Sequence, residues 1–360
     1  IFSSVFFIFT FLPAMLLVYY ISPRKFKNFV LLAGSLIFYA WGEPVYIFLM
    51  IFSICFNYVC GLDIQRCRGR KTAAVLNLIF AVAVNLFILG FFKYYGFVVE
   101  NVNGIFGLHI PVEGLALPIG ISFYTFQTMS YIIDVYRGVV DAQKNIVDFG
   151  LYVSMFPQLI AGPIVKYKDI ANQLKERREC FSKFGYGISR FLQGLAKKVL
   201  IANTIGSVYQ SISNLGLEQL SVLGAWVGIL AFTFQIYFDF SGYSDMAIGL
   251  GQMFGFEFQE NFDHPYEAKG ITDFWRRWHI SLSTWFREYV YIPLGGNRKG
   301  TFRTVRNILI VWLLTGLWHG ASWNFVAWGL YYGILLLIEK FVLRKVFDKL
   351  PAVFVHVYTM

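Results

Sequence analysis

Charged residues are scarce in this chain. Only 14% of its 360 residues are Asp, Glu, Lys or Arg, whereas soluble domains contain about a quarter. Residues 73–92 include no charge at all, and a helix of that length crosses a hydrocarbon core of about 30 Å. Because such apolar runs recur along the sequence, the composition predicts an all-α, polytopic membrane protein. It excludes a soluble domain with a single anchor.

Cysteines and familiar catalytic motifs are also few. The four cysteines, Cys55, Cys60, Cys67 and Cys180, form no C-x-x-C pair, so we expect free thiols, without a disulfide framework or a metal site. No histidine stands in H-E-x-x-H, and the segment 242–246 lacks the last glycine of G-x-S-x-G. These absences disfavour a zinc protease and a serine hydrolase. We expect no metal and no tightly bound cofactor.

Basic residues gather between the apolar runs and give a net charge of +10. Between membrane spans such clusters are typical of cytoplasmic loops, so we expect no nucleic acid partner. The chain then begins outside the cell. The predicted spans cover residues 5–20, 29–41, a third segment that ends at Arg66, and 73–92, and an outer loop follows at 98–113.

The middle of the chain is less regular. Residues 115–136 return inward, and 149–165 have basic residues on both sides, which predicts a re-entrant hairpin. A helix over 185–213, interrupted by Lys197 and Lys198, is expected at the cytoplasmic interface. Residues 220–240 and 242–258 follow as spans or half-spans.

Ser241 and Gly242 are expected to break the helix between those two segments. Asp239 and Asp245 flank that break. Each carboxylate either caps a helix end or pairs with an arginine of the basic segment, or else it contacts a polar substrate.

The segment 272–289 reads as one amphipathic helix with Thr272 or Asp273 as its N-cap. Its apolar face is formed by Trp275, Trp278, Leu282, Trp285 and Tyr289. His279 lies among these residues, as a possible catalytic group or as a packed interfacial histidine. The loop 292–300 is glycine-rich and basic. It is either a simple turn or a site where backbone N–H groups and Arg298 or Lys299 hold an anionic donor.

His319 lies in an apolar stretch, residues 307–338, that has no other titratable side chain except Tyr331 and Tyr332. An ionisable group at membrane depth is costly, and therefore usually has a function or a partner. Gly316 and Gly320 are expected to leave room beside its ring. Two apolar arms joined by a turn at 318–323 would place it about 18 Å above Asn307, past the midplane. Its alternative role is to tie two helices together.

These motifs together resemble the membrane-bound O-acyltransferase family. The resemblance rests on Trp275-Arg276-Arg277-Trp278-His279 and Trp318-His319-Gly320, in the company of segment 239–244, and it extends over essentially the whole chain. The stretch 289–298 is similar to the members that acetylate alginate and departs from those that transfer D-alanine. The resemblance implies one membrane-embedded domain, residues 1–360, which either lacks C-terminal helices or is a short member. Spanning, re-entrant and interfacial helices would surround a thinned core with a tunnel to the cytoplasm.

The resemblance also implies that His319 is the catalytic histidine and that His279 is the second motif histidine. An acyl thioester needs a base for the incoming hydroxyl and not a protein nucleophile. We assign that base to His319, and His279 orients the donor or assists the leaving thiolate. The expected substrate-binding residues are Trp275, Arg276, Trp278, Ser283, Asn297, Arg298, Asp239, Tyr243, Trp318 and Trp323.

The predicted function is acetyl transfer from a cytoplasmic thioester, acetyl-CoA or another, to a hydroxyl of an alginate-like exopolysaccharide or of a partner protein. The expected setting is the bacterial inner membrane, with membrane lipid, a polysaccharide acceptor and an extracytoplasmic SGNH-hydrolase-like acetyltransferase as partners. Three alternatives remain: D-alanyl or other acyl transfer to a cell-wall polymer, a non-enzymatic transporter or flippase, and a scaffold that recruits partners. A transporter would predict an inverted repeat, and the two halves of the sequence show none.

Overall fold

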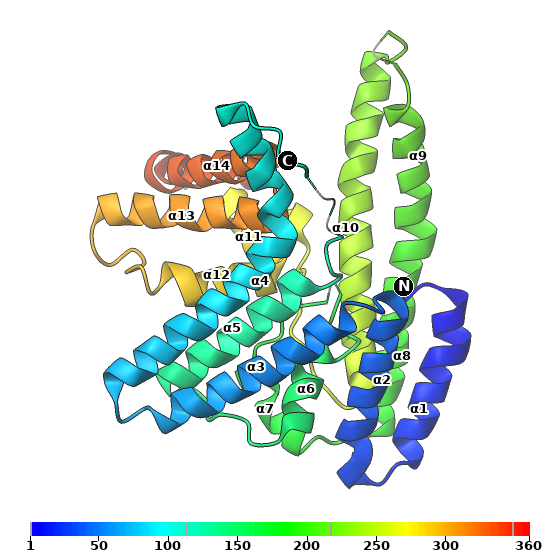
Figure 1. Ribbon diagram of the computed structural model, residues 1–360. Coiled ribbons are helices and arrows are strands. Elements are labelled where there is room, and N and C mark those ends of the chain that lie inside the picture. Colours follow the sequence, from blue (N-terminus) through cyan, green and yellow to red (C-terminus); the bar gives the residue numbers. More distant parts are fainter. Residues whose placement is uncertain (1, 113, 115, 161, 217, 348) are drawn as a thin grey trace. The chain divides into compact units, whose positions relative to one another are not determined.

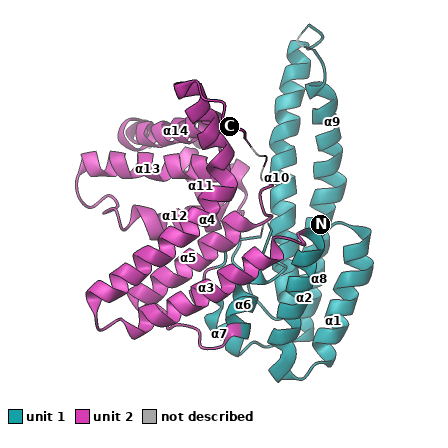
Figure 2. Cartoon of the chain, in the orientation of Figure 1, with its two compact units in different colours: residues 1–42, 147–165, 169–260 teal, residues 43–146, 166–168, 261–360 magenta. Residues whose placement is uncertain are grey.

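The computed structural model describes residues 2–360 apart from 113, 115, 161, 217 and 348 (Figure 1). The described residues are mainly helical and contain no β-strand, which confirms the predicted all-α class. The chain forms two compact units (Figure 2). Unit 1 comprises Ile1–Gly42, Val147–Val165 and Asp169–Glu260, and unit 2 comprises Glu43–Ile146, Lys166–Lys168 and Asn261–Met360. The prediction of a single domain stays a prediction.

Unit 1 contains the first two helices of the chain and most of the helices between residues 146 and 253. Its helices, two of which begin at its border, are α1 (Leu12–Ile21), α2 (Lys27–Gly42), α6 (Ile146–Ser154), α7 (Tyr167–Lys175), α8 (Phe181–Ala196), α9 (Asn203–Ser213) and α10 (Val222–Met253). A π-helical turn, Phe7–Phe11, leads into α1, and another, Lys197–Ala202, joins α8 to α9. The predicted interruption of the helix at Lys197 is therefore confirmed as a change of helical pitch. The long helix α10 packs along α8 and α9 (Figure 1).

Unit 2 carries the histidine motifs. Its helices are α3 (Ile47–Arg66), α4 (Lys71–Phe106), α5 (Ile121–Arg137), α11 (Ile271–Arg277), α12 (Ile280–Phe286), α13 (Thr301–His319), α14 (Trp323–Ile338), α15 (Arg344–Phe347) and α16 (Ala352–Thr359). Helices α3, α4 and α5 pack against one another, and α13 packs along α14. The predicted pair of apolar arms with a turn at 318–323 is confirmed as this helical hairpin, in which the turn is shorter and covers residues 320–322.

Within the part of the chain that the structure describes, four helices are long and apolar enough to cross a membrane: Ile47–Arg66, Lys71–Phe106, Val222–Met253 and Trp323–Phe347. The protein is therefore a multi-pass membrane protein, and the third predicted span is confirmed as a helix. The first two predicted spans are the shorter helices Phe7–Ile21 and Lys27–Gly42. Helix α4 continues to Phe106, so the outer loop predicted to begin at residue 98 is wrong in its first part. Residues 113 and 115, where that loop was to end and the next segment to begin, lie outside the described residues.

The re-entrant hairpin predicted over 149–165 is only partly helical. Helix α6 ends at Ser154, and turns follow, with a hydrogen bond from Gln158 N to Met155 O. Its depth in a membrane stays a prediction.

The helix break predicted at Ser241-Gly242 is wrong, because α10 runs through both residues without interruption. Gly242 instead allows α8 and α10 to approach closely. A Cβ at Gly194 would lie 2.4 Å from Gly242 O, and a Cβ at Gly242 would lie 2.8 Å from Gly194 O. The glycine was mistaken for a helix breaker because tertiary contact overrides its weak helix propensity.

Asp239 and Asp245 pair with basic residues of the neighbouring helix. Lys197 Nζ lies 2.6 Å and Arg190 Nη2 lies 2.7 Å from the Asp245 carboxylate, and Lys198 Nζ lies 2.8 Å from Asp239. Of the roles left open for these carboxylates, the structure shows ion pairing with the basic segment. Both lysines pair with carboxylates, and the expected place of this helix at the cytoplasmic interface stays a prediction.

Replacing Gly194 with Ala should destabilise unit 1 by about 1–3 kcal/mol, because the added methyl group overpacks the contact between α8 and α10. Thermal unfolding of the purified protein in detergent measures this. Gly185→Ala on the same helix is the matched control, since a Cβ there meets nothing within 4 Å. Equal melting temperatures for the two variants would contradict the close contact.

Candidate active site

The predicted amphipathic helix over 272–289 is wrong as a single element. It consists of α11, α12 and a π-helical turn, Arg287–Tyr291. The break falls at His279, whose backbone is left-handed, with φ of 48°. Trp278 is extended at this point and forms an isolated bridge with Phe262. The three- and four-residue spacing of the aromatic residues is compatible with a helix on each side of His279. The sequence pattern therefore did not reveal the break between them.

The N-cap predicted at Thr272 or Asp273 is also wrong, because α11 begins one residue earlier. Its first backbone N–H groups, of Ile271 and Thr272, donate to the carboxylate of Glu339 over 2.6 and 3.0 Å. Asp273 instead accepts from Lys269 N (3.0 Å). Burial opposes the charge of Asp273, but this bond and Arg277 lower its pKa below the usual value.

His279 is buried and held by Asn261. Its Nδ1 lies 3.2 Å from Asn261 Oδ1, which also accepts from the backbone N and the hydroxyl of Ser281. Because a carbonyl oxygen only accepts, we assign the proton to Nδ1, which makes Nε2 the acceptor nitrogen. Burial, and then the nearby His319, lower the pKa of His279 to about 3. This imidazole is therefore neutral at physiological pH.

The short helix α12 fixes this segment to α5. The Trp285 indole donates to Phe126 O over 2.9 Å, and the two rings stack with centroids 4.0 Å apart. One turn on, the Tyr289 hydroxyl donates to Asp134 Oδ2 over 2.7 Å. The residues that follow His279 thus have a rigid support.

His319 is the last residue of α13 and is exposed, which leaves its ring accessible to a substrate. It lies among aromatic rings, with centroids 4.9 Å from Trp328 and 5.0 Å from Trp318. The Trp318 ring also lies 5.7 Å from that of His279. The indole of Trp318 is therefore in contact distance of both histidines.

The expected room beside His319 is filled by α14. A Cβ at Gly316 would lie 2.3 Å from Phe325 O, and one at Gly320 would lie 2.2 Å from the Phe325 ring. From the other helix, a Cβ at Gly329 would lie 2.4 Å from Trp312 O. The glycines serve the contact between two helices, and the free space near His319 is elsewhere.

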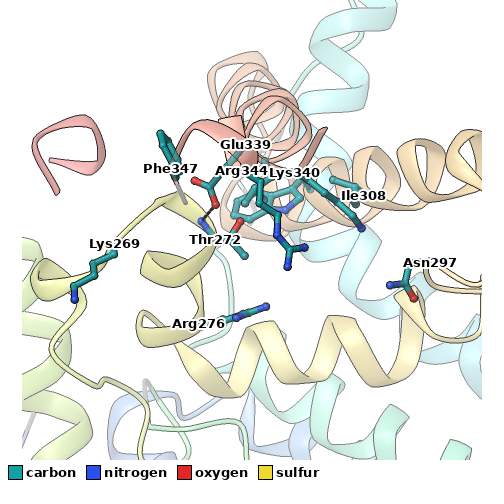
Figure 3. A pocket seen from close by; sticks show the side chains of 11 residues that line it. Lys269, Thr272, Arg276, Asn297, Ile308, Glu339, Lys340, Arg344 and Phe347 are labelled. Atoms are coloured by element: carbon teal, nitrogen blue, oxygen red, sulfur yellow. Dashed lines mark hydrogen bonds between the residues drawn. The ribbon is translucent and has the colours of Figure 1, made fainter. Parts of the chain in front are cut away.

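That space is a cavity of about 280 Å³ lined by both histidines. A second cavity of about 580 Å³ shares part of its wall (Figure 3). The shared residues are Thr272, Arg276, Ile308, Trp312 and Leu336. The walls of the second cavity carry four cations, Lys269, Arg276, Lys340 and Arg344, and one carboxylate, Glu339. A mainly apolar cavity with two imidazoles thus adjoins a basic one.

The structure brings together some of the predicted binding residues. Those that line the histidine cavity are Trp275, Arg276, Trp278 and Ser283. Asn297 lines only the basic cavity, whereas Arg298 is exposed and lines neither.

The remaining predicted residues have other neighbours. Trp323 donates from Nε1 to Asn101 Oδ1 over 2.8 Å. In unit 1, Asp239 pairs with Lys198, and the Tyr243 ring stacks on Phe2 at 4.8 Å. None of these three lines the two cavities. Their roles in binding stay predictions.

Sequence reasoning missed most of the basic wall. None of Lys269, Glu339, Lys340 and Arg344 is among the predicted site residues. The available signal was a cluster of charges directly after the apolar run that ends at Ile338. Among the described residues, no group of three or more His, Cys, Asp or Glu is arranged to hold a metal ion.

Comparison with known proteins gives a consistent result. A model of the membrane-bound O-acyltransferase family matches residues 141–349. The chain is 49% identical over 344 residues to "Probable alginate O-acetylase AlgI" of Azotobacter vinelandii (94% of this chain, 68% of that protein) and of Pseudomonas aeruginosa (94% and 66%). It is 38% identical over 374 residues to the peptidoglycan O-acetyltransferase of Helicobacter pylori (94% and 70%). The chain spans about two thirds of the length of these relatives.

The left-handed backbone at His279 gives a stability prediction. A non-glycine residue in this conformation is strained by about 1–2 kcal/mol, so His279→Gly should be more stable than His279→Ala by about 1 kcal/mol. At Ser283, within α12, the order should reverse, because Ala is the better helix former. Thermal unfolding of the four variants in detergent tests both orders. If His279→Ala were as stable as His279→Gly, the left-handed backbone at residue 279 would not be strained.

Proposed function

Because the chain belongs to the membrane-bound O-acyltransferase family, its reaction is the transfer of an acyl group to oxygen, and we propose that it moves acetyl from a thioester donor to a hydroxyl of an exopolysaccharide. The observation that carries this proposal is the pair of adjoining cavities, one lined by His279 and His319 and one lined by cations. The names of the relatives, alginate O-acetylase and peptidoglycan O-acetyltransferase, favour acetyl over D-alanyl as the group transferred.

In this proposal His319 is the general base. It takes the proton of the acceptor hydroxyl while the hydroxyl oxygen attacks the thioester carbonyl. The tetrahedral oxyanion then collapses, the C–S bond breaks and the thiolate leaves with the proton that the imidazolium returns. No protein nucleophile is required, because the thioester is already activated.

His279 has a different role, which follows from its protonation. With Nδ1–H directed to Asn261, its Nε2 can accept a hydrogen bond but has no proton to give to a leaving thiolate. Of the two roles expected for it, orientation of the donor is therefore favoured over assistance to the thiolate. An amide N–H of the donor's arm is a suitable partner.

The donor's anionic end suits the basic cavity. Its walls carry four cations, Lys269, Arg276, Lys340 and Arg344, against one carboxylate, so they have a net positive charge. That carboxylate, Glu339, also accepts hydrogen bonds from Ile271 and Thr272. Acetyl-CoA, whose phosphates lie remote from its thioester, matches a basic cavity next to an apolar one. Arg276 lines both cavities and would contact the donor where it passes between them.

The acceptor and the partners are inferred from the relatives' names and from the family resemblance. We propose an alginate-like polymer or a hydroxyl of an extracytoplasmic SGNH-hydrolase-like acetyltransferase that completes the transfer, with the protein in the bacterial inner membrane. D-alanyl transfer to a cell-wall polymer remains the alternative reaction.

His319→Ala should reduce transfer of labelled acetyl from a thioester donor by at least about 100-fold, the usual share of a general base. The variant should still be inserted in the membrane at the wild-type level. His109→Ala, in an exposed loop, is the control and should transfer normally. If the His319→Ala variant still transferred acetyl at the wild-type rate, His319 would not be the general base.

Arg344→Gln should raise KM for acetyl-CoA about 10-fold, the effect of losing one charge-assisted contact to phosphate. KM for acetyl-pantetheine, which has no phosphate, should not change. Lys345→Gln is the matched control, since Lys345 lines neither cavity. Equal increases of KM for both donors would show that the basic cavity does not bind phosphate.

A further inference from the structure

Lys93 is a cation within α4, a helix that is otherwise apolar enough to span a membrane. A charged side chain in such a helix is costly and usually has a partner or a function. Lys93 lines neither cavity near the histidines. Its ammonium instead donates to the backbone carbonyl of Trp318 and to Ser122 Oγ, the latter over 3.3 Å.

The next residue makes a parallel contact. The Tyr94 hydroxyl donates to the carbonyl of Leu317 over 2.6 Å. The last four carbonyl groups of a helix have no partner within it, and those of Leu317 and Trp318 belong to the last turn of α13. Two adjacent side chains of α4 thus satisfy two adjacent carbonyls at the end of the helix that terminates in His319.

The contact also fixes the Trp318 ring. The Lys93 ammonium lies 5.4 Å from the centroid of that ring. On its other sides the ring lies 5.6 Å from Phe123, 5.7 Å from His279 and 5.0 Å from His319. A cation at the negative end of a helix and over an indole face is favourable in both respects.

We propose that Lys93 and Tyr94 are positioning residues for acyl transfer: they fix the last turn of α13 and so hold His319 and the Trp318 ring in register with His279. Only the kinetic consequence of this inference rests on the proposed function. Both residues donate to carbonyls of the α13 backbone and line neither cavity. Their loss should therefore reduce the rate of the chemical step, since a displacement of about 1 Å can cost about 100-fold, and leave donor binding intact.

The kinetic test compares Lys93→Met, Lys93→Arg and Tyr94→Phe in the purified full chain, with acetyl-CoA as donor. We expect kcat to fall about 10- to 100-fold in Lys93→Met, with donor KM within about twofold of wild type. Arg keeps the charge and should restore part of kcat. Tyr94→Phe removes one oxygen atom and should lower kcat without unfolding the protein. Tyr95→Phe is its matched control, because the Tyr95 hydroxyl has no hydrogen-bond partner among the described residues.

A second measurement does not depend on acyl transfer. In protein labelled with 5-fluorotryptophan, the ¹⁹F resonance of Trp318, assigned with Trp318→Phe, should shift or broaden in Lys93→Met and stay unchanged in Lys144→Met. If wild type transfers no acetyl but the resonance shifts as expected, the proposed function fails and the positioning role stands. The inference is overturned if the resonance is unchanged, if Tyr94→Phe and Tyr95→Phe have equal kcat, or if only donor KM rises.

Discussion

The backbones of α13 and α14 touch at Gly316 and Gly329, and the candidate active site depends on this contact. A Cβ at either glycine would lie 2.4 Å or less from a carbonyl oxygen of the other helix, so no other residue allows the same approach. Since α13 ends at His319 and the chain reverses over 320–322, the distance between the two helices determines where the imidazole lies. The aromatic neighbours of His319 on α14, Phe325 and Trp328, reach it only at this distance.

The same hairpin also holds the segment that leads to His279. Glu339 follows directly after α14, and its buried carboxylate accepts from the first two N–H groups of α11. Negative charge at a helix N-terminus is stabilising, and the contact ties α11 to the open end of the hairpin. His319 at the turn and α11 at the base are thus fixed by one element. This arrangement explains how two motifs forty residues apart in the sequence come to line one cavity.

The sequence predicted what depends on composition and missed what depends on tertiary contact. Long apolar runs with basic flanks identified the α-helical membrane class and the hairpin around His319. Pairing with the basic segment was one of the readings left open for Asp245. Gly242 was read as a break because glycine in isolation disfavours helix, and only the presence of α8 reveals its purpose. The left-handed turn at His279 has only a weak local signal, because few non-glycine residues adopt this conformation, although histidine is enriched among those that do. The basic cavity was missed because its cations come from segments distant in sequence, Lys269 to Arg276 and Lys340 to Arg344.

The basic cavity beside the histidine cavity has a chemical consequence for the proposed reaction. Binding energy obtained at a part of the donor that does not react can be used to hold the reacting part in place. Cations at the phosphate end of a thioester donor would supply that energy without facing the base. A histidine that must accept a proton is weakened by a nearby positive charge. Of the four cations of the basic cavity, Arg276 also lines the histidine cavity, where Arg287 is a second cation. Donor anchoring and acyl transfer can therefore occupy adjoining cavities, whose shared wall comes from α11, α13 and α14.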